Sequence, residues 1–182
     1  SPCDGMVMHK PVKTATIDRW LDLLADSPYR NDLVNADTFH IVLDMYNYHR
    51  FHAPVSGRLV DMRLVDGVHN AGGTILWDKE QGRYRYESLN NEDFQMFEKR
   101  GVMVIDSPEW GRVAMVPVGV AQVSSVRWLD GITVGTEVQA GQELGYFLCG
   151  GSDVVLFFEK RIRYTAAVGD LLRVGQPIAT LI

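Results

Sequence analysis

Two apolar runs separated by a glycine turn constrain this chain more than any other feature. The run YFLC at positions 146–149 and the run VVLFF at positions 154–158 each have the length of a buried strand. Gly150, Gly151 and Ser152 separate them, and glycine pairs of this kind mark turns and bulges. The pattern predicts two buried strands with one serine held at their junction.

In most other segments apolar and polar residues alternate, as they do in strands that bury one face. This alternation predicts strands at residues 37–45, 58–65, 83–86, 102–105 and 112–118, and successive strands at 120–128 and 131–138. Residues 17–24 instead place apolar residues at helical spacing, which predicts one short amphipathic helix capped by Thr16 and ended near Ser27, and residues 94–98 favour a helical turn. The predicted fold class is therefore α+β, with mainly antiparallel β-sheets and one or two short helices.

A short pattern occurs twice in the C-terminal third of the chain. Residues 134–144 and 168–178 share the arrangement V-G-x-x-(V/L)-x-x-G-Q-x-(L/I). The repeat predicts a pair of similar hairpin turns on a compact β scaffold, and it resembles the turns of biotinyl and lipoyl carrier domains. We expect a biotinyl/lipoyl-like β substructure inside a single domain spanning residues 1–182, because no linker or low-complexity run divides the chain.

Composition and charge exclude several classes of protein. The chain has 182 residues, of which 46% are apolar, as in globular proteins with a substantial core. Its net charge is −5, and no basic cluster is interleaved with aromatic residues, so nucleic acid is not an expected partner. No run approaches the roughly 20 apolar residues of a membrane span, and no signal peptide is evident. We expect a soluble, cytoplasmic protein, with peripheral membrane association as an open alternative.

The sequence gives little support to a metal site or a disulfide. Cys3 and Cys149 lie far apart without Cys-x-x-Cys spacing, so buried free thiols are expected, with a disulfide as the alternative. His49 and His52 lie close together, but no third ligand stands at a recognised spacing, so no metal is expected. A purely structural pair is the competing interpretation. The three other histidines, His9, His40 and His69, are interpreted as structural.

The glycine turn permits a self-modification of the chain. Without side chains at positions 150 and 151, the Ser152 hydroxyl has room to reach the carbonyl of Gly151. Attack there converts the peptide bond to an ester, elimination leaves dehydroalanine, and hydrolysis yields a pyruvoyl group and a chain cut between residues 151 and 152. Such a carbonyl can form a Schiff base with a substrate amine and accept the electrons left by departing carbon dioxide. By itself, however, Gly-Gly-Ser is more typical of a hairpin with a solvated serine.

Four motifs in a fixed order favour the chemical interpretation. They are SPCDG at 1–5, YHRFHAPVSG at 48–57, VGVAQV at 118–123 and GGS at 150–152. Over nearly the whole chain they resemble the motifs of the phosphatidylserine decarboxylase family. The resemblance implies a self-processing carboxy-lyase whose covalent pyruvoyl cofactor derives from Ser152, and it implies a homodimer.

The same resemblance implies roles for three further residues. His52 matches the base that assists self-cleavage, and Asp4 matches the carboxylate that orients this base. His49 matches the residue placed for decarboxylation, where it protonates the carbanion. Histidine suits proton transfer because its unperturbed pKa is about 6.5. Considered alone, Asp4 before Gly5 is a common turn pair.

Three positions depart from the family motifs: Asn47, Ser124 and Asp153. Asp153 is the most consequential, because a carboxylate beside the scissile bond opposes the negative charge that develops on the attacked carbonyl. We expect self-cleavage to be slowed unless Asp153 points away from the bond or a cation compensates its charge.

The expected function is pyruvoyl-dependent decarboxylation of an amino-acid group, either the head group of phosphatidylserine or a free amino acid, including an aromatic one. The aromatic stretch from Trp77 to Phe97 could line an acyl groove or an aromatic pocket, although such residues are more often core and surface. A non-cleaving pseudoenzyme is one alternative, which Asp153 favours. A carrier or binding domain is another, but Lys160 directly follows an apolar strand and is a poor attachment site.

Overall fold

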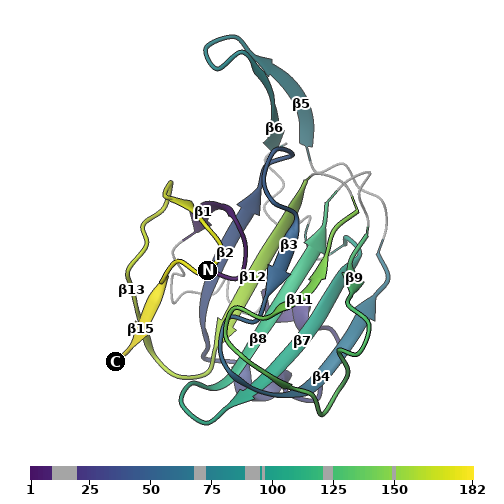
Figure 1. Cartoon of the computed structure of the whole chain (residues 1–182), viewed down its shortest axis with the longest axis vertical. Helices are drawn as coiled ribbons and strands as arrows, with labels where there is room; N and C mark the ends of the chain where they lie inside the picture. Colours follow the sequence, from purple (N-terminus) through teal and green to yellow (C-terminus); the bar gives the residue numbers. More distant parts are fainter. Residues whose placement is uncertain (10–19, 68–72, 89–94, 96, 121–124, 149–150) are drawn as a thin grey trace.

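An eight-stranded antiparallel sheet forms the centre of the computed structural model, which describes residues 1–9, 20–67, 73–88, 95, 97–120, 125–148 and 151–182. The strand order is β10-β4-β7-β8-β12-β2-β1-β14 (Figure 1). In chain order these strands are β1 (Gly5–His9), β2 (Asp37–Leu43), β4 (Gly57–Val65), β7 (Arg100–Ser107), β8 (Gly111–Gly119), β10 (Glu137–Val138), β12 (Ser152–Phe158) and β14 (Leu171–Leu172).

Three smaller sheets and two short helices complete the described part of the fold. One sheet joins β3 (Arg50–His52), β11 (Glu143–Tyr146) and β9 (Arg127–Trp128); the others are β13 (Ile162–Tyr164) with β15 (Ala179–Leu181), and the hairpin of β5 (Gly73–Asp78) and β6 (Arg83–Ser88). Both helices, η1 (Leu21–Leu24) and η2 (Arg30–Leu33), are of the 3-10 type. The predicted antiparallel β architecture with short helices is confirmed.

Strand β12 runs through the middle of the large sheet. Each of its residues from Ser152 to Phe158 pairs with a residue of β2 on one side and with a residue of β8 on the other. All seven residues are buried, as predicted for the apolar run that follows the glycine turn. A strand buried on both faces has a continuously apolar sequence rather than an alternating one, which explains the sequence VVLFF.

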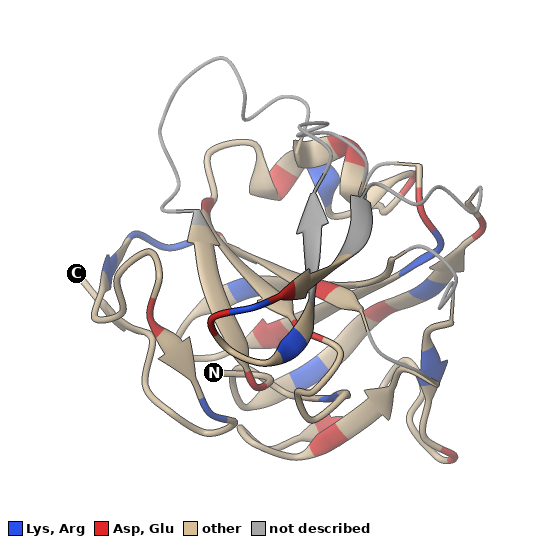
Figure 2. Cartoon of the chain, turned by 90° about the horizontal axis from the view of Figure 1, so that it is seen from above, with Lys and Arg blue, Asp and Glu red and all other residues tan. Residues whose placement is uncertain are grey.

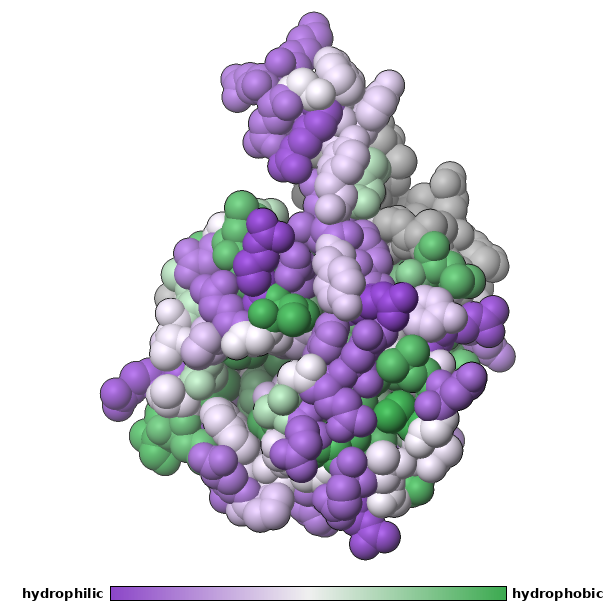
Figure 3. All heavy atoms as spheres, viewed as in Figure 1, coloured by the Kyte–Doolittle hydropathy of each residue, from purple (hydrophilic) through white to green (hydrophobic). Residues whose placement is uncertain are grey.

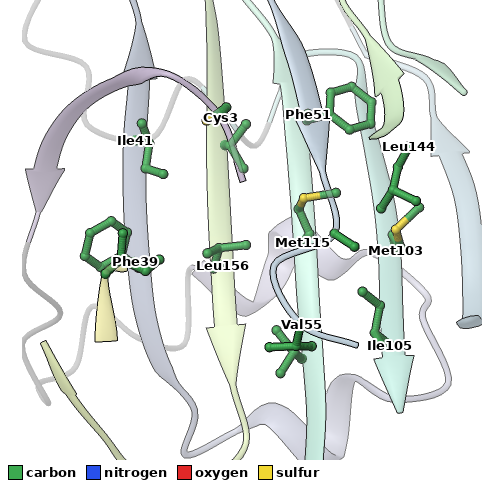
Figure 4. Packing of buried hydrophobic residues seen from close by; sticks show 14 of the residues in the cluster. Cys3, Phe39, Ile41, Phe51, Val55, Met103, Ile105, Met115, Leu144 and Leu156 are labelled. Atoms are coloured by element: carbon green, nitrogen blue, oxygen red, sulfur yellow. The ribbon is translucent and has the colours of Figure 1, made fainter. Parts of the chain in front are cut away.

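Apolar clusters cover both faces of this sheet. Successive side chains of a strand point to opposite faces, so Val154 and Leu156 enter one cluster while Val155 and Phe157 enter the other. Figure 4 shows the first cluster, where side chains of neighbouring strands pack against Leu156. The leucines of η1 and η2 belong to the second. Cys3 is a free thiol buried in the first cluster, and Cys149 lies outside the described residues.

Five of the predicted strands are confirmed, as β2, β4, β6, β7 and β8. The buried strand predicted at 146–149 is wrong, because β11 ends at Tyr146 and neither Phe147 nor Leu148 lies in a strand. The strands predicted at 120–128 and 131–138 are wrong in extent, because only the two-residue strands β9 and β10 form in the described part of these segments. Turn hydrogen bonds replace the ladder between them, from the N–H of Ile132 to the Leu129 carbonyl and from the N–H of Thr136 to the Thr133 carbonyl.

The predicted helix at residues 17–24 is described only from Trp20 onward: Trp20 is α-helical, and the chain continues as the 3-10 helix η1. Ala25 ends it with a positive φ of 49°, while its N–H donates to the Asp22 carbonyl at 3.1 Å. This bond spans three residues, as in a 3-10 turn. Of the helical turn predicted at 94–98, residues 94 and 96 lie outside the described residues, and Gln95 has 3-10 geometry.

The repeated pattern forms equivalent turns at the two edges of the large sheet. The first turn has Gly135 and Gly141 at φ values of 94° and 83°, and the second has Gly169 and Gly175 at 90° and 80°. These values lie in the region that glycine enters without steric cost, so the repeated glycines are required by the turns themselves. The predicted pair of similar turns is confirmed, whereas the likeness to biotinyl and lipoyl domains stays a prediction.

Each repeated turn also packs on an equivalent partner segment. Strand β10 pairs with the start of β4, and β14 pairs with the start of β1. The N–H of Gly141 donates to the Ala53 carbonyl at 2.8 Å, and the N–H of Gly175 donates to the Ser1 carbonyl at 2.9 Å. The segments that contain these carbonyls, SPCDG at 1–5 and APVSG at 53–57, therefore hold matching positions.

Charged residues of both signs are interspersed over the described ribbon (Figure 2). Within the part of the chain that the structure describes, no helix combines the length and apolar character that crossing a bilayer requires.

Replacing Leu156 by alanine should lower the free energy of unfolding by about 2 to 5 kcal/mol, because a side chain with no exposed surface leaves a cavity in the central strand. Urea unfolding in an uncleaved Ser152→Ala background measures this loss. Leu171→Ala is the matched control, since the Leu171 side chain is 77% exposed, and it should change stability by less than about 0.5 kcal/mol. Equal losses in the two variants would contradict the central position of β12.

Candidate functional site

Ser152 begins the central strand and is almost completely buried, with 1% of its surface exposed. It pairs with Leu43 of β2 and with Gly119 of β8. Its Oγ atom has no hydrogen-bond partner among the described residues. Buried hydroxyls are normally hydrogen-bonded, because burial without a partner costs free energy, and an exception is expected where chemistry requires a free group. The structure thus places the serine predicted from the glycine turn in a buried, unpartnered position.

Gly151 precedes the strand with a φ of 99°, in the region that side-chain-bearing residues avoid. Its N–H donates to Nε2 of His49 at 3.0 Å. The structure therefore brings His49 to the residue whose carbonyl would be attacked. Cys149 and Gly150 lie outside the described residues.

Both ring nitrogens of His49 have partners. Nδ1 lies 2.7 Å from the Asn47 carbonyl, and because a carbonyl only accepts, Nδ1 carries the hydrogen and Nε2 accepts from Gly151. Burial lowers the pKa of His49, opposed by the hydrogen bond to Asn47 and the charge of Asp44. His49 is consequently a neutral imidazole at neutral pH, and its one ring lone pair, on Nε2, accepts the N–H of Gly151.

A closed turn between β2 and β3 positions His49. The backbone N–H of Asn47 donates to the Asp44 carbonyl at 2.8 Å, and the backbone N–H of Asp44 donates to Oδ1 of Asn47 at 2.7 Å. The N–H of Phe147 donates to the His49 carbonyl at 3.0 Å, which ties the turn to the segment before the cleavage site. Asn47, one of the departures from the family motifs, therefore closes the turn and sets the tautomer of His49.

His52 lies at the end of β3 and is buried beside the N-terminal motif. Its backbone N–H donates to the Pro2 carbonyl at 2.8 Å, and its ring Nδ1 lies 3.3 Å from the same oxygen. The Tyr48 ring packs against it with 5.9 Å between ring centroids. The partner that orients His52 in this structure is the carbonyl of Pro2.

Asp4 is buried and bound to the second repeated turn. Its carboxylate accepts the N–H of Val174 at 2.8 Å and an N–H of Arg173 at 3.1 Å. Within the described residues, no hydrogen bond joins it to His52. The matching segment at 53–57 has Ser56 at this position, and Oγ of Ser56 accepts the N–H of Ala140 at 2.9 Å. Asp4 thus holds a turn, and the family roles of Asp4 and His52 stay predictions.

Asp153 points to the opposite face of the sheet from Ser152, because adjacent side chains of β12 alternate. It is 2% exposed, and its Oδ2 forms hydrogen bonds with Nε2 of His40 and with Nε2 of Gln95, each at 2.9 Å. One of the two conditions expected for self-cleavage, a carboxylate directed away from the bond, is met. Sequence reasoning missed this cluster because its members lie 113 and 58 residues from Asp153 along the chain.

The β5–β6 hairpin carries part of the aromatic stretch and stands clear of the body (Figure 1), with hydrophilic residues at its tip (Figure 3). Leu76, Trp77 and Tyr84 are exposed on it, and the rings of Trp77 and Tyr84 meet edge to face at 4.9 Å. Arg83 lies over the Tyr46 ring, 5.9 Å from its centroid. Since Tyr46 belongs to the turn that positions His49, the hairpin contacts the site. Residues 89–94 and 96 of the stretch lie outside the described part.

A cavity of about 230 Å³ lies between the two repeated turns and borders Pro2 and Ala53, next to His52. It is lined by Ser1, Pro2, Ala53, Pro54, Val55, Trp110, Ala140, Gly141, Phe158, Gly175, Gln176, Pro177, Ile178 and Ala179. The lining contains none of His49, Gly151 and Ser152. Among the described residues, no group of three or more His, Cys, Asp and Glu side chains could hold a metal ion.

Comparison with known proteins gives one consistent family. Residues 1–180 match the family profile described as Phosphatidylserine decarboxylase. The chain is 33% identical over 138 residues to phosphatidylserine decarboxylase proenzyme 2 of Oryza sativa subsp. japonica, covering 76% of this chain and 20% of that protein. It is 32% identical over 147 residues to phosphatidylserine decarboxylase proenzyme 2 of Komagataella phaffii, covering 72% of this chain and 13% of that protein. It is 30% identical over 145 residues to the proenzyme of Chlamydia muridarum, covering 79% and 44%. The chain thus spans less than half the length of these relatives.

In the uncleaved Ser152→Ala protein, replacing His49 by glutamine should reduce the loss of stability on acidification. The folded pKa of His49 is lowered, so the folded state binds fewer protons here than the unfolded chain does. The contribution of the neutral His49 to the free energy of unfolding is complete above the unfolded pKa of about 6.5. It is lost as the pH falls through the lowered pKa of the folded state. Urea unfolding across this pH range measures the difference in free energy of unfolding between the protein with His49 and the His49→Gln variant. This difference should shrink toward low pH. A constant difference would contradict a neutral His49.

Proposed function

The chain belongs to the phosphatidylserine decarboxylase family, and from this premise we propose that it cleaves itself between Gly151 and Ser152 and then decarboxylates the serine head group of phosphatidylserine. The observation that carries the proposal is the buried Ser152 hydroxyl, which has no partner among the described residues and directly follows a glycine with positive φ. Two of the motifs support the proposal by their contacts, since His49 accepts the N–H of Gly151 and Gly119 pairs with Ser152.

Cleavage proceeds in steps whose atoms balance. Oγ of Ser152 attacks the carbonyl carbon of Gly151, its proton passes through a base to the departing nitrogen of Ser152, and the amide bond is exchanged for an ester. Removal of the Cα proton of Ser152 then expels the Gly151 carboxylate together with the former Oγ, which leaves dehydroalanine. Addition of water and loss of ammonia leave the pyruvoyl group at the start of β12.

The residues present fit such a group. Position 152 pairs with strands on both sides, so the new terminus stays anchored in the sheet after the chain is cut. The unpartnered Oγ is the atom that the reaction consumes, and its loss breaks no hydrogen bond with the described residues. When formed, the pyruvoyl carbonyl binds the substrate amine and accepts the electron pair left by carbon dioxide.

The histidines divide the proton transfers in our proposal. His52 assists the attack by Ser152, with Asp4 supporting it through the N-terminal motif, as the family resemblance implies. His49 first holds the cleavage segment by accepting from Gly151, and this contact supports a place beside the reacting bond. After cleavage, Nε2 of His49 is the nitrogen free to deliver a proton to the substrate, because Nδ1 remains bound to the Asn47 carbonyl.

Phosphatidylserine is the preferred substrate because the similar proteins carry its name. The exposed Leu76, Trp77 and Tyr84 beside the site support contact with a lipid surface, since amphipathic aromatic residues favour membrane interfaces. A free aromatic amino acid is the second candidate, because the same exposed rings could bind an aromatic side chain. Peripheral membrane contact and the homodimer belong to the proposal as well.

Intact-mass measurement under denaturing conditions tests the self-cleavage. The full-length protein should give two pieces separated between residues 151 and 152, the second carrying pyruvoyl in place of Ser152. Ser152→Ala should remain one chain, because it lacks the attacking oxygen. A single unmodified wild-type chain would favour the pseudoenzyme, and a cofactor mass on a lysine would favour the carrier.

Two histidine variants test the division of roles. His52→Ala should slow or abolish splitting, whereas His49→Ala should still split but lose turnover by a factor of about 10² to 10⁴, the range of general acid–base contributions. Release of carbon dioxide from phosphatidylserine vesicles and from free tryptophan measures turnover and separates the two substrates. Normal turnover by His49→Ala would show the assignment to be wrong.

A further inference from the structure

The cluster of Asp153, His40 and Gln95 lies behind the cleavage site and has no part in the steps above. Asp153 is the second residue after the scissile bond, and its carboxylate is nearly completely buried. Its Oδ2 lies 2.9 Å from Nε2 of His40 on the neighbouring strand β2 and 2.9 Å from Nε2 of Gln95. An ionised carboxylate only accepts hydrogen bonds, so both nitrogens direct hydrogens at the same oxygen.

Buried neighbours surround this cluster on its face of the sheet. His40 packs edge to face on the Trp20 ring, with 5.3 Å between centroids, and it is itself buried. Arg100 of β7 pairs with Val118, the same residue that pairs with Asp153, so these two charged side chains lie on one face of the sheet. The guanidinium of Arg100 donates to the carbonyls of Asp22, Leu23 and Glu98.

A buried negative charge at this position opposes self-cleavage in two ways. The attack by Ser152 develops negative charge on the Gly151 carbonyl oxygen, and like charges repel strongly in a poorly solvated site. A buried carboxylate without donors is also costly in free energy, so it would favour rearrangements that bring other hydrogen-bond donors to it. Such rearrangements near the start of the strand would disturb the position of Ser152. The two N–H groups on Oδ2 counter both effects, because they provide hydrogen bonds to the carboxylate on the face that strand alternation gives it and partly offset its charge.

We propose, resting on the function proposed above, that His40 and Gln95 are positioning residues for self-cleavage: they fix the orientation of the Asp153 carboxylate on its face of the sheet and offset its charge beside the scissile bond. They act only through Asp153 and touch none of the reacting atoms. This assigns a task to His40, which the sequence indicated only as structural, and it accounts for an aspartate at a position where the family motif has threonine.

The test follows cleavage of the full-length chain during cell-free synthesis, by the appearance of the piece that begins at residue 152. His40→Ala should slow cleavage by about tenfold, less than the factor of about 10² to 10³ for a donor that contacts the oxyanion itself, because His40 acts only through Asp153. Asp153→Asn keeps an oxygen acceptor for both donors but removes the charge, so it should cleave at least as fast as wild type. His40→Gln retains an N–H donor and should cleave within about threefold of wild type.

The double variant His40→Ala/Asp153→Asn separates positioning from a general structural role. With the charge removed, the loss of His40 should matter little, and cleavage should return to within about threefold of Asp153→Asn. A merely structural His40 would leave the double variant as slow as His40→Ala. Ser27→Ala is the matched control, because it removes a donor from another buried carboxylate, Asp61, at 2.6 Å and should leave the cleavage rate unchanged. Thermal unfolding in the Ser152→Ala background shows that each variant folds.

The remaining outcomes are decisive. Wild-type cleavage with an unaffected His40→Ala, or a double variant as slow as His40→Ala, would overturn the inference and leave the proposed function intact. Cleavage by Asp153→Asn but not by wild type would overturn the inference, because the donors would then fail to offset the charge, and it would also overturn the proposed self-cleavage of the wild-type chain. Cleavage by neither protein would remove the proposed function and the inference with it.

Discussion

Pairing of β12 on both of its edges, from its first residue onward, is the constraint on which the rest of the structure depends. Ser152 is held between β2 and β8, so its side chain must enter one face and that of Asp153 the other. Cutting the chain before Ser152 removes no residue from the strand, and the new terminus keeps its place in the sheet. On the proposed function, the backbone bond before Ser152 can be cut without disturbing the site, because the geometry needed afterwards is set by strand pairing rather than by chain connection.

The internal repeat gives the N-terminal motif a physical explanation separate from catalysis. Asp4 and Ser56 hold matching positions, and each accepts a backbone N–H from the repeated turn that packs on it. A serine suffices for this hydrogen bond at position 56, so the turn alone does not demand a carboxylate at position 4. The additional charge of Asp4 meets Arg173 at the surface of the turn. A residue that belongs to a catalytic motif by resemblance is thus also part of the scaffold, and its substitution affects both.

Much of the fold followed from the sequence because its longer strands are either nearly continuously apolar, as β12 is, or carry apolar residues at frequent, partly alternating positions, as β4 does. The run at 154–158 indicated the buried central strand, and the glycine turn placed Ser152 at its beginning. The segment 131–138 misled because its apolar residues belong to turns whose hydrogen bonds, such as that from Gly135 to the Leu59 carbonyl, depend on a distant strand. The orientation of Asp153 was implicit in the alternation of a strand. Its partners were not, because no spacing pattern links position 153 to His40 or Gln95.

Self-cleavage, on the proposed function, changes the chemistry of His49 without requiring the ring to move. In the uncleaved chain the imidazole is neutral, since burial lowers its pKa and Nε2 accepts from Gly151. After the chain is cut, Gly151 carries a new terminal carboxylate next to that nitrogen, and a nearby negative charge favours the protonated imidazole. The same Nδ1 contact with the Asn47 carbonyl suits both states, because Nδ1 donates in each. Cleavage would therefore convert a proton acceptor into a proton donor at the moment when decarboxylation begins to need one.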